Sequence, residues 1–202
     1  MKYQRPAVYI LLMLGSAHLL NDLIQSMLTA TYPLLENKFA LTFAQIGTIS
    51  LVYQLTASIL QPGIGHFTDK RPMPYLLPFG MMSTVFGISM LSMTESYSVI
   101  LISAAFMGIG SSIFHPEASR LARYASGGRY GLAQSIFQVG GNLGSAFGPL
   151  LASLIIVRHA KQENILYFTI FGAIAILLLF KISHWSASLN RENGAARKTF
   201  TP

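Results

Sequence analysis

Six long stretches of this chain are apolar and almost free of charge, and this pattern limits the fold more than any other feature. Each stretch can cross a lipid bilayer as a helix, which takes about 20 residues. Inside a bilayer the backbone must satisfy its own hydrogen bonds, so only helices and closed barrels can span it. Barrels require alternating strands, whereas these stretches are continuously apolar. We predict an all-α membrane protein with helices at 7–35, 43–67, 73–93, 99–121, 130–157 and 165–182.

The composition agrees with a lipid environment, because 52% of the 202 residues are hydrophobic and only 10% are charged. The chain has no cysteine and therefore offers neither a disulfide nor a cysteine metal site. The first apolar stretch follows Lys2 and Arg5, as a signal peptide would, but His18, Asn21 and Asp22 interrupt it. We interpret it as an uncleaved membrane span.

The net charge of +7 reflects topology more than an affinity for nucleic acid. Eleven of the 14 basic residues lie on the N-terminal side or in alternate loops, and three lie on the opposite side. The positive-inside rule then places both termini in the cytoplasm. The partner predicted by the charge pattern is the bilayer, with no nucleic acid. The eleven are Lys2, Arg5, Lys70, Arg71, Arg120, Arg123, Arg129, Lys181, Arg191, Arg197 and Lys198, and the three are Lys38, Arg158 and Lys161.

The predicted helices differ in polarity. The third and sixth contain no charged side chain within 75–93 and 165–180, so they can face lipid. The other four carry polar stripes at helical spacing, which we expect to turn inward. The order polar, polar, apolar occurs twice, which indicates two three-helix repeats of inverted topology. The stripes are His18, Asp22, Gln25 and Thr29; Gln54, Ser58 and Gln61; Ser112, His115 and Ser119; and Gln134, Gln138, Asn142 and Ser145.

Most of these polar residues have two open interpretations. A Gln, Ser or Asn stripe can simply hold a helix bundle together, or it can line a binding site. The carboxylates of Asp22 and Glu117 favour the second reading, because a charged group at the centre of a membrane helix costs about 2.5–3.5 kcal/mol. Asp22 could still serve as a structural hydrogen-bond partner of Arg120 or of another polar group on the fourth helix.

The loop after the second helix carries a partial family signature. It reads Gly65-His66-Phe67-Thr68-Asp69-Lys70-Arg71-Pro72. This resembles the cytoplasmic motif G-x-x-x-D-(R/K)-x-G-(R/K)-(R/K) of the major facilitator superfamily. Gly65, Asp69 and Lys70 match, while Pro72 replaces the second glycine. The resemblance implies a cytoplasmic gate in which Asp69 meets Arg120 or Arg123 in the outward-open state.

The fifth helix is similar to the superfamily's antiporter motif G-x-x-x-G-P-x-x-G-G. Gly144, Gly148 and Pro149 match, whereas Ala152 and Ser153 replace the final glycines. Small residues also let a neighbouring helix approach closely, and an internal proline permits a bend. A packing role and an antiporter role are therefore both open.

Longer stretches resemble the bacterial fosmidomycin-resistance transporters from the first helix through the sixth. Members of that family are drug:proton antiporters of the inner membrane with twelve helices, so this chain resembles the N-terminal half. Ala104 replaces the arginine of the superfamily's fourth-helix signature, so the likeness does not extend to coupling through that arginine. The matching stretches are 18–22, 114–117, 125–129 and 131–142.

The resemblance implies a function and a domain organisation. We expect a six-helix bundle at 1–182, and the polar, basic segment 183–202 reads as a cytoplasmic linker or tail. The expected activity is proton-coupled export of a small, anionic phosphonate-type drug such as fosmidomycin. It would use the proton gradient, with no cofactor or metal, and a C-terminal six-helix half as partner.

The residues expected to bind protons or substrate centre on Asp22. This residue lies on the first helix, which we expect to line the cavity. His115 and Glu117 lie about 200° apart around their helix, so only one of them can face the same cavity. We expect the other to pair with a neighbour. The full set comprises His18, Asp22, Gln25, His115, Glu117, Gln138 and Asn142.

Two other classes of function stay open on the sequence. One is a truncated or split-gene fragment without transport activity of its own, since half of the cavity wall would be missing. The other is an intramembrane serine protease, with Ser111 or Ser112 beside His18 or His115, although no spacing supports it. The sequence contains no Walker loop that would bind ATP.

The charge distribution generates a topology prediction. Reporter proteins fused at Lys161 and at Arg191 should report opposite compartments, with the Arg191 fusion in the cytoplasm. A reporter pair such as alkaline phosphatase and green fluorescent protein measures this directly. Fusions that report the same side would show that the six-span topology is wrong.

Overall fold

The computed structural model describes residues 7–71 and 73–199, and it describes side chains up to residue 189. These residues form long helices joined by short connections, without any strand in the described part of the chain. The helices are α1 (Val8–Ala30), α2 (Tyr32–Phe39), α3 (Phe43–Lys70), α4 (Leu76–Met93), α5 (Tyr97–Ala125), α6 (Tyr130–Ala152) and α7 (Phe168–Thr199). A π-helical segment, η1 (Ser153–Val157), and a 3-10 segment, η2 (Gln162–Tyr167), connect α6 to α7.

Six of these helical units are long and apolar enough to cross a membrane, by length and composition. They are Val8–Phe39, Phe43–Lys70, Leu76–Met93, Tyr97–Ala125, Tyr130–Val157 and Gln162–Leu189. The six predicted spans are therefore confirmed within a few residues at most boundaries. The last one differs more, because α7 continues as helix beyond residue 182 to Thr199. Ser183 and Ser186 are buried, so the start of the expected tail belongs to the bundle.

Local sequence signals explain several helix ends. Thr42 and Gln45 form a reciprocal capping box at the start of α3, where each side chain accepts from the other residue's backbone N–H. Gly127 and Gly128 adopt positive φ angles of 58° and 92° in the turn between α5 and α6. Pro149 lies in the last turn of α6, just before the π-helical segment, where a missing backbone donor loosens the regular helix.

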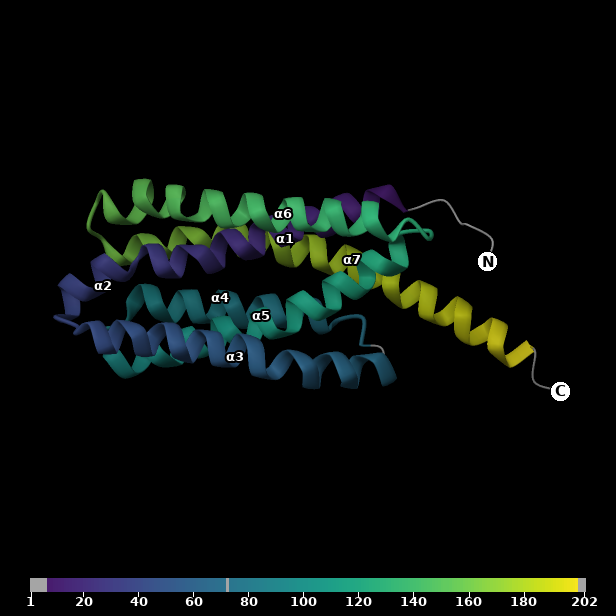
Figure 1. Ribbon diagram of the computed structural model, residues 1–202, viewed down its shortest axis with the longest axis horizontal. Coiled ribbons are helices and arrows are strands. Elements are labelled where there is room, and N and C mark those ends of the chain that lie inside the picture. Colours follow the sequence, from purple (N-terminus) through teal and green to yellow (C-terminus); the bar gives the residue numbers. More distant parts are fainter. Residues whose placement is uncertain (1–6, 72, 200–202) are drawn as a thin grey trace.

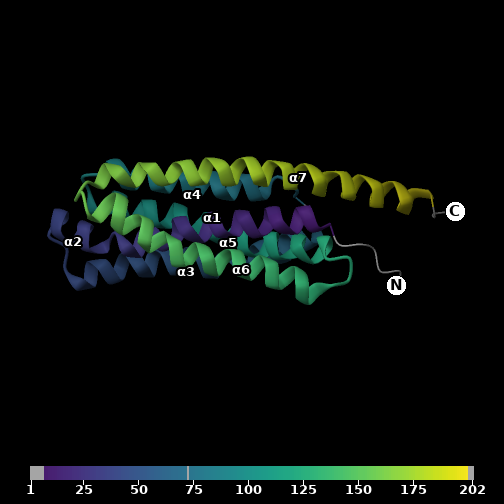
Figure 2. The same cartoon turned by 90° about the horizontal axis from the view of Figure 1, so that it is seen from above.

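The helices pair in a pattern that a two-fold axis would produce. The most extensive packing joins α1 with α6, α4 with α5, and α3 with α5, and α7 packs on both α1 and α4. A two-fold axis would exchange α1 with α5, α3 with α6, and α4 with α7. This exchange turns the pair α1–α6 into the pair α5–α3. This is the arrangement expected of two inverted three-helix repeats. Figures 1 and 2 show the start of α1 and the end of α7 toward the same end of the bundle.

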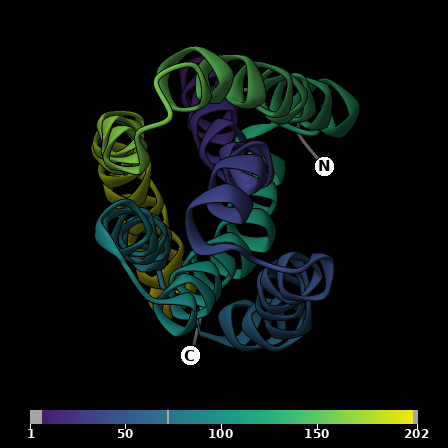
Figure 3. The same cartoon turned by 90° about the vertical axis from the view of Figure 1, so that its left-hand side faces the viewer.

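An end-on view shows how the pairs are distributed (Figure 3). The pair α4 and α7 lies on one side, as expected for the two spans that have no charged side chain within 75–93 and 165–180. On the other side, α3 and α6 form the two edges, and α1 and α5 lie between them. The face made by α3, α1, α5 and α6 is therefore the polar face of the bundle.

The expected inward orientation of two polar stripes is wrong for this six-helix bundle. Gln54 and Ser58 of α3 are exposed, and so are all four polar stripe residues of α6. In α6 the inward positions belong to glycines, which let the backbone of α1 come close. The polar side chains therefore lie on the opposite face. The four are Gln134, Gln138, Asn142 and Ser145.

Glycines set the distance between α1 and α6. A Cβ atom added at Gly140 would overlap the carbonyl oxygen of Gly15, and one added at Gly144 would overlap the carbonyl oxygen of Leu19. Gly148 stands in the same relation to Leu23 one turn further on. This face of α6 therefore packs backbone against backbone, which confirms the packing role of the Gly144 and Gly148 motif.

This packing predicts that the effect of a larger side chain on stability depends on its position along α6. Gly140→Val should destabilise the bundle by roughly 1–3 kcal/mol, because overpacking pushes two backbones apart. Gly131→Val is the matched control, since no atom lies within 4 Å of a Cβ at Gly131. Thermal unfolding of the purified chain in detergent measures the difference. Equal melting temperatures for the two variants would contradict the close approach.

Candidate functional site

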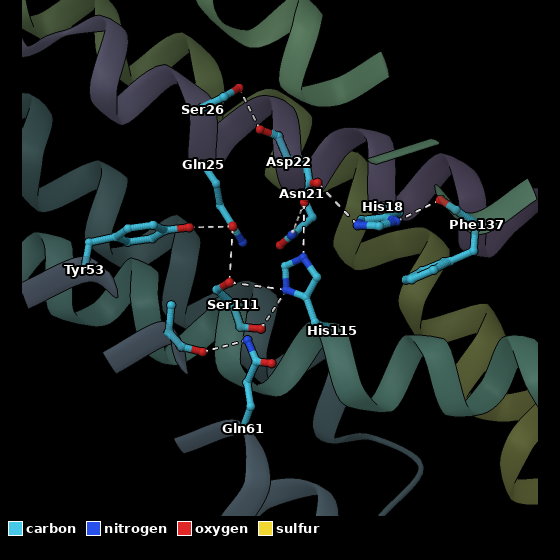
Figure 4. Close-up of polar contacts among 11 residues, drawn as sticks. His18, Asn21, Asp22, Gln25, Ser26, Tyr53, Gln61, Ser111, His115 and Phe137 are labelled. Atoms are coloured by element: carbon cyan, nitrogen blue, oxygen red, sulfur yellow. Dashed lines mark hydrogen bonds and ion pairs between the residues drawn. The ribbon is translucent and has the colours of Figure 1, made fainter. Parts of the chain in front are cut away.

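A carboxylate between two histidines forms the centre of the polar site. The Oδ2 atom of Asp22 lies 3.3 Å from His18 Nε2, one helical turn away on α1. Its other oxygen, Oδ1, lies 3.5 Å from His115 Nε2 on α5. Figure 4 shows the two imidazole rings approaching Asp22 from different helices. The sequence placed all three residues in one site, and the structure brings them into contact.

Both histidines are fixed through their second ring nitrogen. His18 Nδ1 lies 2.8 Å from the carbonyl oxygen of Phe137 on α6. His115 Nδ1 lies 3.0 Å from the carbonyl oxygen of Ser111, one turn back on α5. A carbonyl oxygen only accepts, so each Nδ1 atom carries a hydrogen and donates it. Each Nε2 atom is therefore the one that Asp22 faces.

Aromatic rings and a glycine enclose the His18 ring. It stacks on Phe137 with a centroid distance of 4.0 Å and an interplanar angle of 21°. Phe114, fully buried on α5, approaches it at 5.7 Å. A Cβ atom at Gly141 would collide with His18 Cε1 and Nε2 and with Asp22 Oδ2. The glycine therefore leaves the space in which the imidazole and the carboxylate meet.

Gln25 extends the polar network toward α3. Its Oε1 atom accepts from Tyr53 Oη at 2.5 Å and from Ser111 Oγ at 3.2 Å. Ser111 Oγ also lies 3.3 Å from His115 Nδ1. The network therefore links α1, α3 and α5 through neutral groups beside the charged centre, as Figure 4 shows.

Tyr53 and the Phe137 carbonyl were missed by the sequence analysis. Tyr53 lies one position before the polar stripe that begins at Gln54, and a buried tyrosine hydroxyl needs a hydrogen-bond partner. That rule could have indicated Tyr53. A backbone carbonyl such as that of Phe137 carries no side-chain signal, so only the α1–α6 packing reveals it. Nor did the sequence predict that His18, Asp22 and His115 would offer ligand atoms within 4.8 Å of one another.

Glu117 faces away from this cluster and pairs on its own helix. Its Oε2 atom accepts from Arg120 Nη2 at 2.6 Å, and its side chain is only 3% exposed. His115 and Glu117 therefore face different neighbours, as their spacing predicts. Arg120 pairs with Glu117 and not with Asp22. The polar group of α5 that contacts Asp22 is therefore His115.

The gate residues line a cavity of about 530 Å³ at the end of the bundle where α1 begins. Asp69 and Gly65 of α3 face Arg120 and Arg123 of α5 across it. Among the described residues no ion pair joins Asp69 to either arginine. Arg123 instead lies over the ring of Tyr130 at 5.1 Å. Lys70 is exposed beside Asp69.

Besides Glu117, two residues of the predicted proton or substrate set, Gln138 and Asn142, lie apart from the cluster, and so does Thr29 of the polar stripe on α1. Gln138 and Asn142 are exposed on α6, and their side chains make no hydrogen bond within the described part of the chain. Thr29 is exposed and donates to the carbonyl of Ser26. Ala104 is fully buried in the apolar core.

The Glu117–Arg120 pair predicts a large stability effect. Glu117→Gln should destabilise the bundle by roughly 3–5 kcal/mol, because it leaves the Arg120 charge without its partner in a buried setting. Glu95→Gln is the matched control, since Glu95 is 88% exposed and lies 3.9 Å from Lys38. Melting temperatures in detergent compare the two. A control as damaging as Glu117→Gln would exclude burial as the cause.

Comparison with known proteins agrees with this architecture. The model of the Major Facilitator Superfamily matches residues 14–202. The fosmidomycin resistance protein of Escherichia coli (strain K12) is 54% identical over 177 residues, which cover 88% of this chain and 43% of that protein. The uncharacterized MFS-type transporter YfnC of Bacillus subtilis (strain 168) is 43% identical over 94% of this chain and 47% of its own length.

A more distant relative is the probable nitrate transporter NarT of Staphylococcus carnosus (strain TM300), 23% identical over 78% of this chain and 41% of its own length. The chain thus spans about half the length of the curated relatives it matches. Its six helices correspond to the N-terminal half of the fosmidomycin resistance protein. The chain belongs to the Major Facilitator Superfamily.

Proposed function

We propose that this chain forms the N-terminal half of a proton-coupled antiporter that exports small, anionic phosphonate-type antibiotics such as fosmidomycin. The observation that carries the proposal is the partly buried carboxylate of Asp22, which lies between His18 and His115. An ionisable group inside a membrane bundle is costly and commonly marks a proton or substrate pathway. The 54% identity to a fosmidomycin resistance protein supports the substrate class.

Antiport requires that the proton and the substrate exclude one another at a shared site. Ionised Asp22 attracts both imidazoles and holds them in the observed geometry. A proton on Asp22 removes this charge, so the two protonation states present different histidine arrangements to a substrate. We propose that Asp22 is the principal proton-linked group and that Gln25, Gln138 and Asn142 contact substrate.

The polar face of the bundle is the proposed wall of the transport pathway. Exposed polar side chains of α3 and α6 flank the face on which α1 and α5 carry the cluster. A C-terminal six-helix half placed against this face would enclose them. The proposed location is the bacterial inner membrane with both termini in the cytoplasm, and the proposed energy source is the proton gradient, without a cofactor.

A second candidate is a split-gene or truncated product with no transport activity of its own. The chain covers only 43–47% of the length of the two relatives, which supports this second candidate. Expression of this chain alone, and together with a C-terminal half from a relative, distinguishes the two. Drug resistance restored only by co-expression would support the proposed half transporter. Resistance from the chain alone would point to a homodimer, and resistance from neither would favour the inactive fragment.

In the reconstituted transporter, Asp22→Asn should abolish proton-driven efflux while still permitting substrate exchange between equal pools. The amide keeps the size of the carboxylate but cannot carry the proton. Transport into everted membrane vesicles, with and without a proton gradient, measures both modes. Glu163→Gln, at an exposed position in η2, is the control and should transport normally. Uphill transport by Asp22→Asn would make Asp22 structural and leave His115 or Glu117 as candidates.

A further inference from the structure

We infer that His18, Asp22 and His115 form a binding site for a divalent transition-metal ion. The ligand atoms of the three side chains lie within 4.8 Å of one another. Asp22 Oδ2 lies 3.3 Å from His18 Nε2, and Asp22 Oδ1 lies 3.5 Å from His115 Nε2, so each carboxylate oxygen faces one imidazole nitrogen. Metal–ligand bonds of about 2.0–2.2 Å place tetrahedral ligands about 3.3–3.6 Å apart, so a contraction of this cluster would bring all three side chains onto one ion.

The hydrogen bonds behind the histidines are those of metal ligands. A metal-binding histidine usually donates its other ring N–H to a carbonyl or carboxylate, which fixes the tautomer and the ring. His18 does so to Phe137, and His115 does so to Ser111. When the imidazoles are neutral with the hydrogen on Nδ1, both Nε2 lone pairs point at an oxygen of Asp22. These acceptors repel one another unless a proton or a metal cation lies between them.

Neighbouring groups also hold the Asp22 carboxylate and the His18 ring in place. Asn21 donates from Nδ2 to Asp22 Oδ1 at 3.0 Å, which orients the carboxylate. Phe114 and Phe137 enclose the His18 ring, and Gly141 keeps the space between ring and carboxylate open. The described ligands number three, so a bound ion would keep one position for water or another ligand.

The donor set selects the class of metal. Two imidazoles and one carboxylate suit zinc, cobalt, nickel or copper, whereas calcium and magnesium prefer all-oxygen sites. Because the ligands come from α1 and α5, a bound ion would fix these two helices together. The inference rests on the cluster geometry, and it stands whether or not the proposed antiport is correct.

The test is a cobalt(II) titration of the purified 202-residue chain in detergent. Three exposed histidines outside the cluster are first replaced in the variant His66→Gln/His159→Gln/His184→Gln, so that only the cluster retains imidazoles. We expect one cobalt ion per chain and the intense visible absorption of a tetrahedral site. Zinc added afterwards should displace the cobalt and remove the absorption, while magnesium should not.

Variants of the cluster provide the control. His115→Gln in the same background should weaken cobalt binding at least about tenfold, and circular dichroism shows whether the helices are retained. A second measurement needs no cluster variant and so does not depend on whether such a variant folds. Bound zinc should protect His18 and His115 from acylation by diethylpyrocarbonate. Unchanged cobalt binding in His115→Gln, an octahedral spectrum, or no protection by zinc would overturn the inference. Proton-driven efflux that persists alongside any of these results would leave the proposed function intact.

Discussion

The close approach of α1 and α6 is the contact on which the polar site depends. Gly140 and Gly144 let the two backbones touch, and this contact brings the carbonyl of Phe137 within 2.8 Å of His18 Nδ1. Gly141 leaves room for the imidazole ring beside Asp22. In a lipid environment, where water cannot drive apolar helices together, such backbone packing is a main source of helix association. The same glycines therefore serve both the fold and the site.

The positions of the spans were predictable because hydropathy and length dominate folding in a bilayer. The contact between Asp22 and the histidines was predictable in part, since His18 and Asp22 lie one turn apart and His115 lies on a second polar helix. The orientation of α3 and α6 was not. A polar stripe prefers any environment other than lipid, and a face covered by the proposed C-terminal half would satisfy that preference as well as the bundle interior does.

The sequence also left the partners of the ionisable groups unassigned. Spacing around α5 separates His115 from Glu117, but it does not say which of them meets Asp22. The buried Glu117–Arg120 pair follows from an i, i+3 relation that the sequence contains, whereas the His115–Asp22 contact joins residues 93 positions apart, from position 22 to position 115. Long-range contacts of this kind depend on how the helices pack, which in turn depends on small residues rather than on the charged ones.

The cluster joins two closely packed helix pairs of the bundle. Asp22 and His18 lie on α1, which packs on α6, while His115 lies on α5, which packs on α3. The contact of Asp22 with His115 therefore crosses from one pair to the other. Because each pair is rigid through its own packing, a shift between the pairs would change this contact before it changed the contacts within them. A proton or a metal ion that strengthens or breaks this contact would act directly on the relation between the two pairs.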